Sequence, residues 1–175
     1  MITYTLSTSD EELKQVLALQ QRNLFASVSE EEQKTEGFVT VQHDFKLLKA
    51  MHTKCPHTLA KDGNKVVGYA LSMHPGFGEC IEVLQPMFEQ LRLYPAYSNF
   101  IVMGQVCIDK AYRKQGIFRN LYKTMQEHLL PDFTAIITEV DAKNSRSLHA
   151  HYAVGFEDLG KYATAGKEWV LLYLK

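Results

Sequence analysis

A strand, a basic turn and an amphipathic helix follow one another between residues 100 and 129, and this order constrains the fold more than any other stretch. Residues 100–103 and 106–108 are apolar, which is typical of a buried strand. The helix carries one apolar stripe at helical spacing, made of Leu121, Tyr122, Met125 and Leu129. The stretch therefore predicts a strand and a helix that share a core.

The turn between them, Asp109–Gly116, has the features of an anion-binding site. It contains Lys110, Arg113 and Lys114, and Gly116 lets backbone approach a ligand that a side chain would hold off. The first turn of a helix also offers N–H groups without intrahelical partners and the positive end of the helix dipole. We therefore expect an anionic group to bind here.

The N-terminal segment predicts a strand followed by a capped helix. Residues 2–6 alternate between apolar and polar side chains, as in a strand with one buried face. Ser9 and Glu12 have the spacing of a capping box, and an apolar stripe begins at Leu13.

Further helix signals precede a hairpin. Ser29 and Glu32 repeat the capping-box spacing, and a helical pattern from Phe38 to Met51 is best defined after Asp44 and ends before Pro56. Two apolar runs then flank the sequence Lys-Asp-Gly-Asn-Lys at positions 61–65. Because Asp-Gly is a strong hairpin signal, this is the strongest local prediction in the chain.

The C-terminal part predicts a strand, a short helix and closing strands. Residues 135–140 form a β-rich run with Glu139 near its end. Asn144, Ser147, Leu148 and His151 are spaced to share one face of a helix that Gly155 ends. The runs 156–162 and 168–174 are expected to be the last strands.

Length and charge narrow the class of protein. With 175 residues and 20.0 kDa, we expect one domain over residues 1–175. A net charge of -1 argues against a nucleic-acid binder, whose affinity needs clustered Lys and Arg. No segment has the length and apolarity to span a membrane, and the N-terminus lacks the pattern of a signal peptide, so a cytoplasmic location is predicted.

The cysteines and histidines do not predict a metal site. Cys55, Cys80 and Cys107 are odd in number and far apart, which favours reduced thiols. His149 and His151 are two residues apart and point to different faces of a helix. We therefore expect no metal.

The basic turn resembles the acetyl-coenzyme-A site of the GNAT superfamily of N-acetyltransferases, whose signature is Q/R-x-x-G-x-G/A. Arg113 and Gly116 match it, whereas Phe118 stands where the family usually has a small residue, and Lys110 replaces the usual proline. The resemblance implies that Arg113 and Lys114, with the amides of residues Gln115, Gly116, Ile117 and Phe118, hold the diphosphate of acetyl-CoA.

A second block, about 30 residues downstream, resembles the family pattern N-x-x-A/S-x-x-x-Y-x-x-x-G-F. Asn144, Ser147, Gly155 and Phe156 fall at the expected places. The position of the tyrosine in the family pattern corresponds to His151, and the neighbouring Tyr152 is the alternative. The resemblance implies that Asn144, Ser147 and His151 help to bind the cosubstrate.

The order of predicted elements resembles the whole GNAT fold, a twisted, mixed and mostly antiparallel sheet with helices on both faces and splayed central strands. The resemblance implies that Val106, Cys107 and Ile108 border the pantetheine arm. Residues 74–99 form an insertion relative to the family, either a lid over the acceptor site or a surface elaboration.

The activity implied is N-acetyltransfer, with direct attack of an acceptor amine on acetyl-CoA in a ternary complex. Glu139 is a candidate base, although a strand-end glutamate is more often simply solvated, and His151 or Tyr152 is the candidate acid. Cys107, within a buried strand, is expected to be a packing residue rather than a nucleophile.

The acceptor is either a small-molecule amine or a protein amine, and the sequence does not distinguish them. We expect no nucleic acid or membrane partner, and a homodimer is possible because dimers are common in the family. The alternative function is a non-catalytic module that binds coenzyme A or a protein on a degenerate GNAT scaffold. Phe118 and His151, at positions usually small and tyrosine, favour that alternative.

Overall fold

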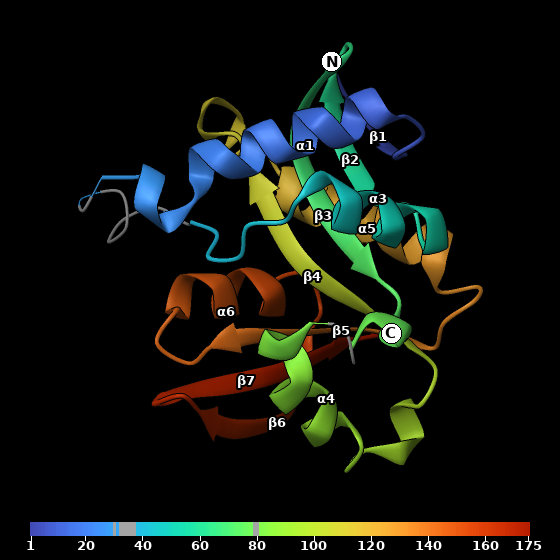
Figure 1. Cartoon of the computed structure of the whole chain (residues 1–175), viewed down its shortest axis with the longest axis vertical. Helices are drawn as coiled ribbons and strands as arrows, with labels where there is room; N and C mark the ends of the chain where they lie inside the picture. The colour runs from blue at the N-terminus through green and yellow to red at the C-terminus, as the bar shows by residue number, and fades with distance from the viewer. Residues whose placement is uncertain (30, 32–37, 79–80) are drawn as a thin grey trace. The chain divides into compact units, whose positions relative to one another are not determined.

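The computed structural model describes residues 1–29, 31, 38–78 and 81–175 of the chain (Figure 1). Its elements follow the predicted order. The predicted helix start at Ser29 and Glu32 lies partly outside the described residues, as does Cys80. The strands and helices are β1 (Ile2–Leu6), α1 (Asp10–Asn23), α3 (Phe45–Lys54), β2 (Thr58–Asp62), β3 (Lys65–Met73), α4 (Gln85–Leu91), β4 (Phe100–Ile108), α5 (Ile117–Leu129), β5 (Ala135–Asp141), α6 (Ser145–Tyr152), β6 (Glu157–Thr164) and β7 (Lys167–Leu174).

The chain divides into two compact units, each made of two stretches. Unit 1 comprises residues 1–72 and 104–125, and unit 2 comprises residues 73–103 and 126–175. Strand β4 and helix α5 each contribute residues to both units. The single domain over residues 1–175 stays a prediction.

The sheet has the strand order β1-β2-β3-β4-β5-β7-β6. The pairs β1–β2, β2–β3, β5–β7 and β6–β7 are antiparallel, and β4–β5 is parallel. The sheet is therefore mixed and mostly antiparallel, which confirms the predicted fold class. None of the helices in the described ranges is long and apolar enough to cross a bilayer.

In unit 1 the local sequence signals produce the predicted boundaries. The Ser9 side chain accepts from the Glu12 amide at 3.3 Å, and Glu12 accepts from the Ser9 amide at 3.2 Å, so the capping box that begins α1 is confirmed. Asp44 caps α3 in the same way, accepting from the Leu47 amide at 2.7 Å. The hairpin is also confirmed, with a φ of +58° at Gly63.

Neighbouring residues of β3 show how unit 1 covers both faces of its strands. Because side chains alternate along a strand, Gly68 and Tyr69 face opposite ways. A Cβ on Gly68 would lie 3.2 Å from Ile117 at the start of α5. On the other face, the Tyr69 hydroxyl donates to the Gln105 side chain, which also accepts from Gln20 of α1. Helices α1 and α5 therefore lie on opposite faces, as Figure 1 shows.

In unit 2 the β4–β5 pairing joins residues 100–102 of β4 to residues 135–137 of β5. At the next position a side chain replaces the backbone ladder, because the Thr138 hydroxyl donates to the Met103 carbonyl at 3.0 Å. Apolar residues of these strands, including Ile101, Ile136 and Ile137, are fully buried.

The insertion, residues 74–99, contains helix α4, with Pro86 in its first turn. Its C-terminal part packs on the β6–β7 hairpin. The Tyr97 ring packs on Tyr173 at a tilt of 55°, with ring centroids 4.8 Å apart, and a Cβ on Gly160 would clash with the Tyr94 hydroxyl. Gly160 follows a register shift in β6, so the strand there leaves room for the insertion.

Candidate functional site

The basic turn of unit 1 is ordered by its acidic residue. Asp109 directly follows β4, and its carboxylate accepts from the Ala111 amide at 3.1 Å, which begins a 3₁₀ turn over Lys110–Tyr112. The same carboxylate lies 3.5 Å from Arg22 and 3.8 Å from Lys65. These contacts tie the start of the turn to α1 and β3.

Two positions near the end of the turn have a left-handed backbone. Lys114 has a φ of 63° and Gly116 a φ of 76°, and α5 begins at the next residue, Ile117. A Cβ on Gly116 would meet only the Asn120 side chain, 3.9 Å away. The space over Gly116 is therefore open, and the first-turn amides of α5 border it, so the turn fits a diphosphate.

Gly68 brings α5 close to the sheet, and sequence reasoning missed it. A Cβ there would lie 3.2 Å from Ile117 Cγ2 and 3.4 Å from the Cys107 carbonyl oxygen. A Cβ at this position would require the Ile117 side chain to shift. A glycine inside an otherwise apolar strand was the available signal.

Arg113 is engaged by the protein itself. Its Nε donates to the Ile108 carbonyl at 3.2 Å, and its Nη2 donates to Asn23 Oδ1 at 2.9 Å. The side chain therefore links the end of β4 to the end of α1. Lys114 and Gln115 are exposed on the turn, and the Gln115 amide donates to the Ala111 carbonyl at 3.3 Å.

Phe118, in the first turn of α5, packs along that helix. Its ring lies edge-on to Tyr122 with centroids 5.0 Å apart, and Tyr122 is 1% exposed. The aromatic ring at the position that is usually small in the GNAT family is thus partly accommodated by the next turn of its own helix.

The β4 residues predicted to border the pantetheine arm are partly or fully buried. Val106 and Ile108 are half-buried, and Cys107 is buried. Burial raises the pKa of the Cys107 thiol to about 12. The thiol is therefore protonated at neutral pH, which disfavours a nucleophilic role.

A second feature of unit 1 that the sequence did not reveal is a pocket of about 570 Å³ beside the turn. Both α1 and the start of the turn contribute to it, with two cationic side chains and one carboxylate. The lining residues are Gln21, Arg22, Asn23, Ser27, Asp109 and Lys110.

In unit 2, α6 begins at the predicted asparagine. Asn144 is its N-cap and accepts from the Ser147 amide at 3.0 Å. The helix ends at Tyr152, three residues before Gly155, which has a φ of +106° and leads into β6. Asn144 therefore lies at the end of the helix rather than on its face.

The two candidate acids differ in exposure. His151 is 2% exposed; its Nδ1 lies 2.7 Å from the Ser147 carbonyl, and burial lowers its pKa to about 4. Tyr152 is 41% exposed and donates to Asp158 at 2.7 Å, and this hydrogen bond raises its pKa to about 12. Neither group is ionised at neutral pH.

Glu139, the candidate base, lies on β5 and has a partner that the sequence did not indicate. The Tyr162 hydroxyl of β6 donates to its carboxylate. Desolvation raises the pKa of Glu139, and the hydrogen bond from Tyr162 opposes that rise. The carboxylate is therefore a stronger base than a solvated one.

The predicted residues thus fall into two sets. Val106–Ile108 and Arg113–Phe118 lie together in unit 1, at the end of β4 and the start of α5. Glu139, Asn144, Ser147, His151 and Tyr152 lie in unit 2. Within the part of the chain that the structure describes, no group of three His, Cys, Asp or Glu side chains is arranged to hold a metal ion.

The family model of the acetyltransferase (GNAT) family matches residues 14–156. The chain belongs to this family. The match includes the basic turn and α6, and it confirms the resemblance drawn from those two motifs. No curated protein sequence matches the chain.

Solved GNAT structures share the fold at low sequence identity. The ribosomal-protein-S18-alanine N-acetyltransferase from Escherichia coli is 13% identical over 99% of this chain and 93% of its own, with a TM-score of 0.66. Salmonella typhimurium yncA, solved with its cofactor acetyl-CoA, is 12% identical over 100% and 94%, with a TM-score of 0.67. An N-acetyltransferase from Staphylococcus aureus Mu50 is 15% identical over 99% and 98%, with a TM-score of 0.67.

Proposed function

We propose that this GNAT protein transfers an acetyl group from acetyl-CoA to an amine, by direct attack within a ternary complex. The observation that carries the proposal is the backbone of the turn, with left-handed Lys114 and Gly116 directly before the first turn of α5. Amides and a helix dipole bind a diphosphate without requiring any particular side chain. The exposed Lys114 adds positive charge.

Acetyl-CoA would be positioned by backbone groups more than by side chains. The amides of Gln115–Phe118 hold the diphosphate, while Val106–Ile108 border the pantetheine arm. Arg113 acts as a positioning residue, because two of its donors already bind Ile108 and Asn23. Asn144, Ser147 and His151 complete the proposed binding set.

The acceptor amine must lose a proton before it attacks, since an alkylamine has a pKa of about 10.4. We assign this step to Glu139, directly or through a water. Its desolvated carboxylate accepts that proton, the amine nitrogen forms a bond to the acetyl carbon, and the carbon–sulfur bond breaks. The nitrogen then releases its second proton, which reaches the departing thiolate through the acid or through solvent. Tyr162 orients the carboxylate.

The departing thiolate is a fair leaving group, so an acid at this step contributes little. Of the two candidates, the exposure of Tyr152 favours it over the buried His151. The hydrogen bond from Tyr152 to Asp158 makes the tyrosine a weak acid, and its effect on the rate is correspondingly small.

Calorimetric titration of acetyl-CoA into wild type, Gly116→Ala and Gly63→Ala tests the cofactor site. Gly63 is a matched control, because it is also left-handed and a Cβ there would meet nothing within 4 Å. Each substitution places alanine in the left-handed region and should lower the free energy of unfolding by about 1–2 kcal/mol. Only Gly116→Ala should weaken acetyl-CoA binding, by about tenfold.

The outcomes are separable. Binding lost in Gly116→Ala and kept in Gly63→Ala supports the site, and release of coenzyme A on addition of small-molecule or peptide amines then identifies the acceptor. Absence of binding to the wild-type protein contradicts the enzyme proposal.

A further inference from the structure

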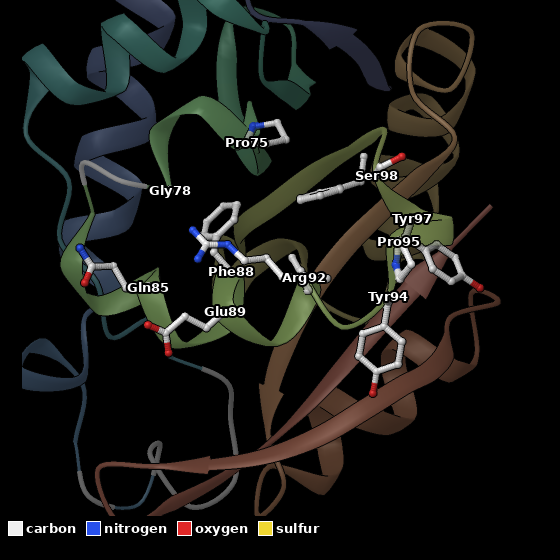
Figure 2. A pocket seen from close by; sticks show the side chains of 12 residues that line it. Pro75, Gly78, Gln85, Phe88, Glu89, Arg92, Tyr94, Pro95, Tyr97 and Ser98 are labelled. Carbon is white, nitrogen blue, oxygen red and sulfur yellow. The ribbon is translucent and has the colours of Figure 1, made fainter.

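Unit 2 contains a pocket of about 590 Å³ that the insertion builds almost alone (Figure 2). Helix α4, the 3₁₀ turns Pro75–Phe77 and Pro95–Tyr97, and Phe100 at the start of β4 provide its walls. Pockets for small molecules commonly measure about 300–1,000 Å³. The proposed acetyl-transfer residues are not among those that line it.

The apolar walls of the pocket are held in place by close packing. The rings of Phe88 and Phe100 lie 6.2 Å apart at 36°, and Met87 and Leu91 are 1% and 6% exposed beneath the helix. Gly78 lies so close that a Cβ there would be 2.7 Å from the Phe88 ring. With the insertion also packed on β6 and β7, the pocket is preformed.

One cation faces this apolar surface. Arg92 lines the pocket together with Phe88, and Figure 2 draws its side chain among the lining residues. Among residues 1–29, 31, 38–78 and 81–175, no side chain accepts a hydrogen bond from its guanidinium or pairs with it. A guanidinium presents two parallel N–H groups, which match the two oxygens of a carboxylate.

The other charge on the rim limits what this cation can bind. Glu89, one helical turn before Arg92, also lines the pocket. Arg92 and Glu89 already balance each other, so a bound monocarboxylate adds a single excess negative charge, whereas a phosphate or another polyanion adds more and is disfavoured. The remaining polar side chains of the lining carry amide or hydroxyl groups and are Gln85, Tyr94, Tyr97 and Ser98.

We propose that this pocket binds a small aromatic monocarboxylic acid. The ring of the ligand packs against Phe88 and Phe100, and its carboxylate pairs with Arg92. The site is separate from the residues assigned to acetyl transfer, so the inference does not depend on that function.

The test compares 3-phenylpropionate with 3-phenylpropionamide, which has the same shape but no charge. Binding to the full chain is measured by ligand-observed NMR titration for wild type, Arg92→Gln, Glu89→Gln and Arg146→Gln. Arg146→Gln removes the same charge from α6 and serves as the control, and thermal melts verify that each variant folds.

We expect the wild-type protein to bind the carboxylate about tenfold more tightly than the amide. Arg92→Gln should abolish this preference, Glu89→Gln should increase it about twofold to threefold, and Arg146→Gln should leave it unchanged. Equal binding of the two ligands, a preference that survives Arg92→Gln, or no binding of either at about 10 mM would overturn the proposal.

Discussion

The turn of unit 1 and the Glu139–Tyr162 pair of unit 2 are built on different principles. The turn is formed by backbone: left-handed residues and the first amides of α5 create its open space, and Arg113 is used for support. The pair is formed by side chains, with one carboxylate and one hydroxyl from β5 and β6.

This difference predicts which kind of substitution should impair each region. If the turn binds a diphosphate as proposed, a site built from backbone should respond to changes in conformation and tolerate changes of side chain, such as Phe118 in place of the usual small residue. A side-chain-built site depends on single atoms. Substitutions that keep the shape of a side chain and alter one atom should therefore impair function strongly at the Glu139–Tyr162 pair of unit 2 and weakly at the turn of unit 1.

The largest expected effect comes from Glu139→Gln, which keeps the shape and removes the carboxylate that we propose as the base. We expect kcat at neutral pH to fall by about a hundredfold, because general-base catalysis typically contributes about 10²–10⁴. Acetyl-CoA affinity, measured by calorimetry, should not change.

The matched control is Glu157→Gln. Glu157 on β6 also accepts from a tyrosine, Tyr173, at 2.6 Å, but is exposed. Its substitution should leave kcat unchanged. An equal loss in both variants would assign the effect to the hairpin rather than to a base.

The next largest effect is expected for Tyr162→Phe, in the pH dependence of kcat/KM. The Tyr162 hydrogen bond lowers the pKa of Glu139 against the effect of desolvation, so its loss raises that pKa. Because the base acts when ionised, the acidic limb of kcat/KM should move to higher pH. Tyr173→Phe, which removes the hydroxyl of the exposed pair, should not move it; a limb that stays in place in Tyr162→Phe would refute the assignment.

The smallest effect on function is expected for Arg113→Gln. Loss of its hydrogen bonds should lower the free energy of unfolding by about 1–3 kcal/mol, measured in urea, with acetyl-CoA affinity reduced only a few-fold. Asn23→Ala should have a similar but smaller effect, and the double variant should be less destabilised than the sum. A hundredfold loss of affinity in Arg113→Gln alone would mean that this side chain binds the ligand.

Much of the fold was predictable because its signals are local. Ser9 with Glu12 begins α1, Asp44 begins α3, and the hairpin forms at Gly63, each through contacts a few residues apart. Gly116 belongs to the same class, since its left-handed backbone depends on the turn itself.

The features that sequence reasoning missed depend on contacts between distant residues. Tyr162 meets Glu139 across 23 positions, and Asn23 meets Arg113 across 90. No periodicity or spacing reports such pairs. Thr138, whose hydroxyl binds the Met103 carbonyl, is likewise visible only once β4 and β5 are paired.

Gly160, on β6, is a residue outside the insertion that contacts it and could indicate its presence. Its missing side chain is the space that the Tyr94 hydroxyl fills. A relative with a short connection between β3 and β4 has no such tyrosine to accommodate. Its residue at the position of Gly160 can therefore be any residue that suits a strand. We therefore expect the insertion and this glycine to be gained and lost together among GNAT proteins, which offers a way to recognise from genomes alone the relatives that carry the pocket.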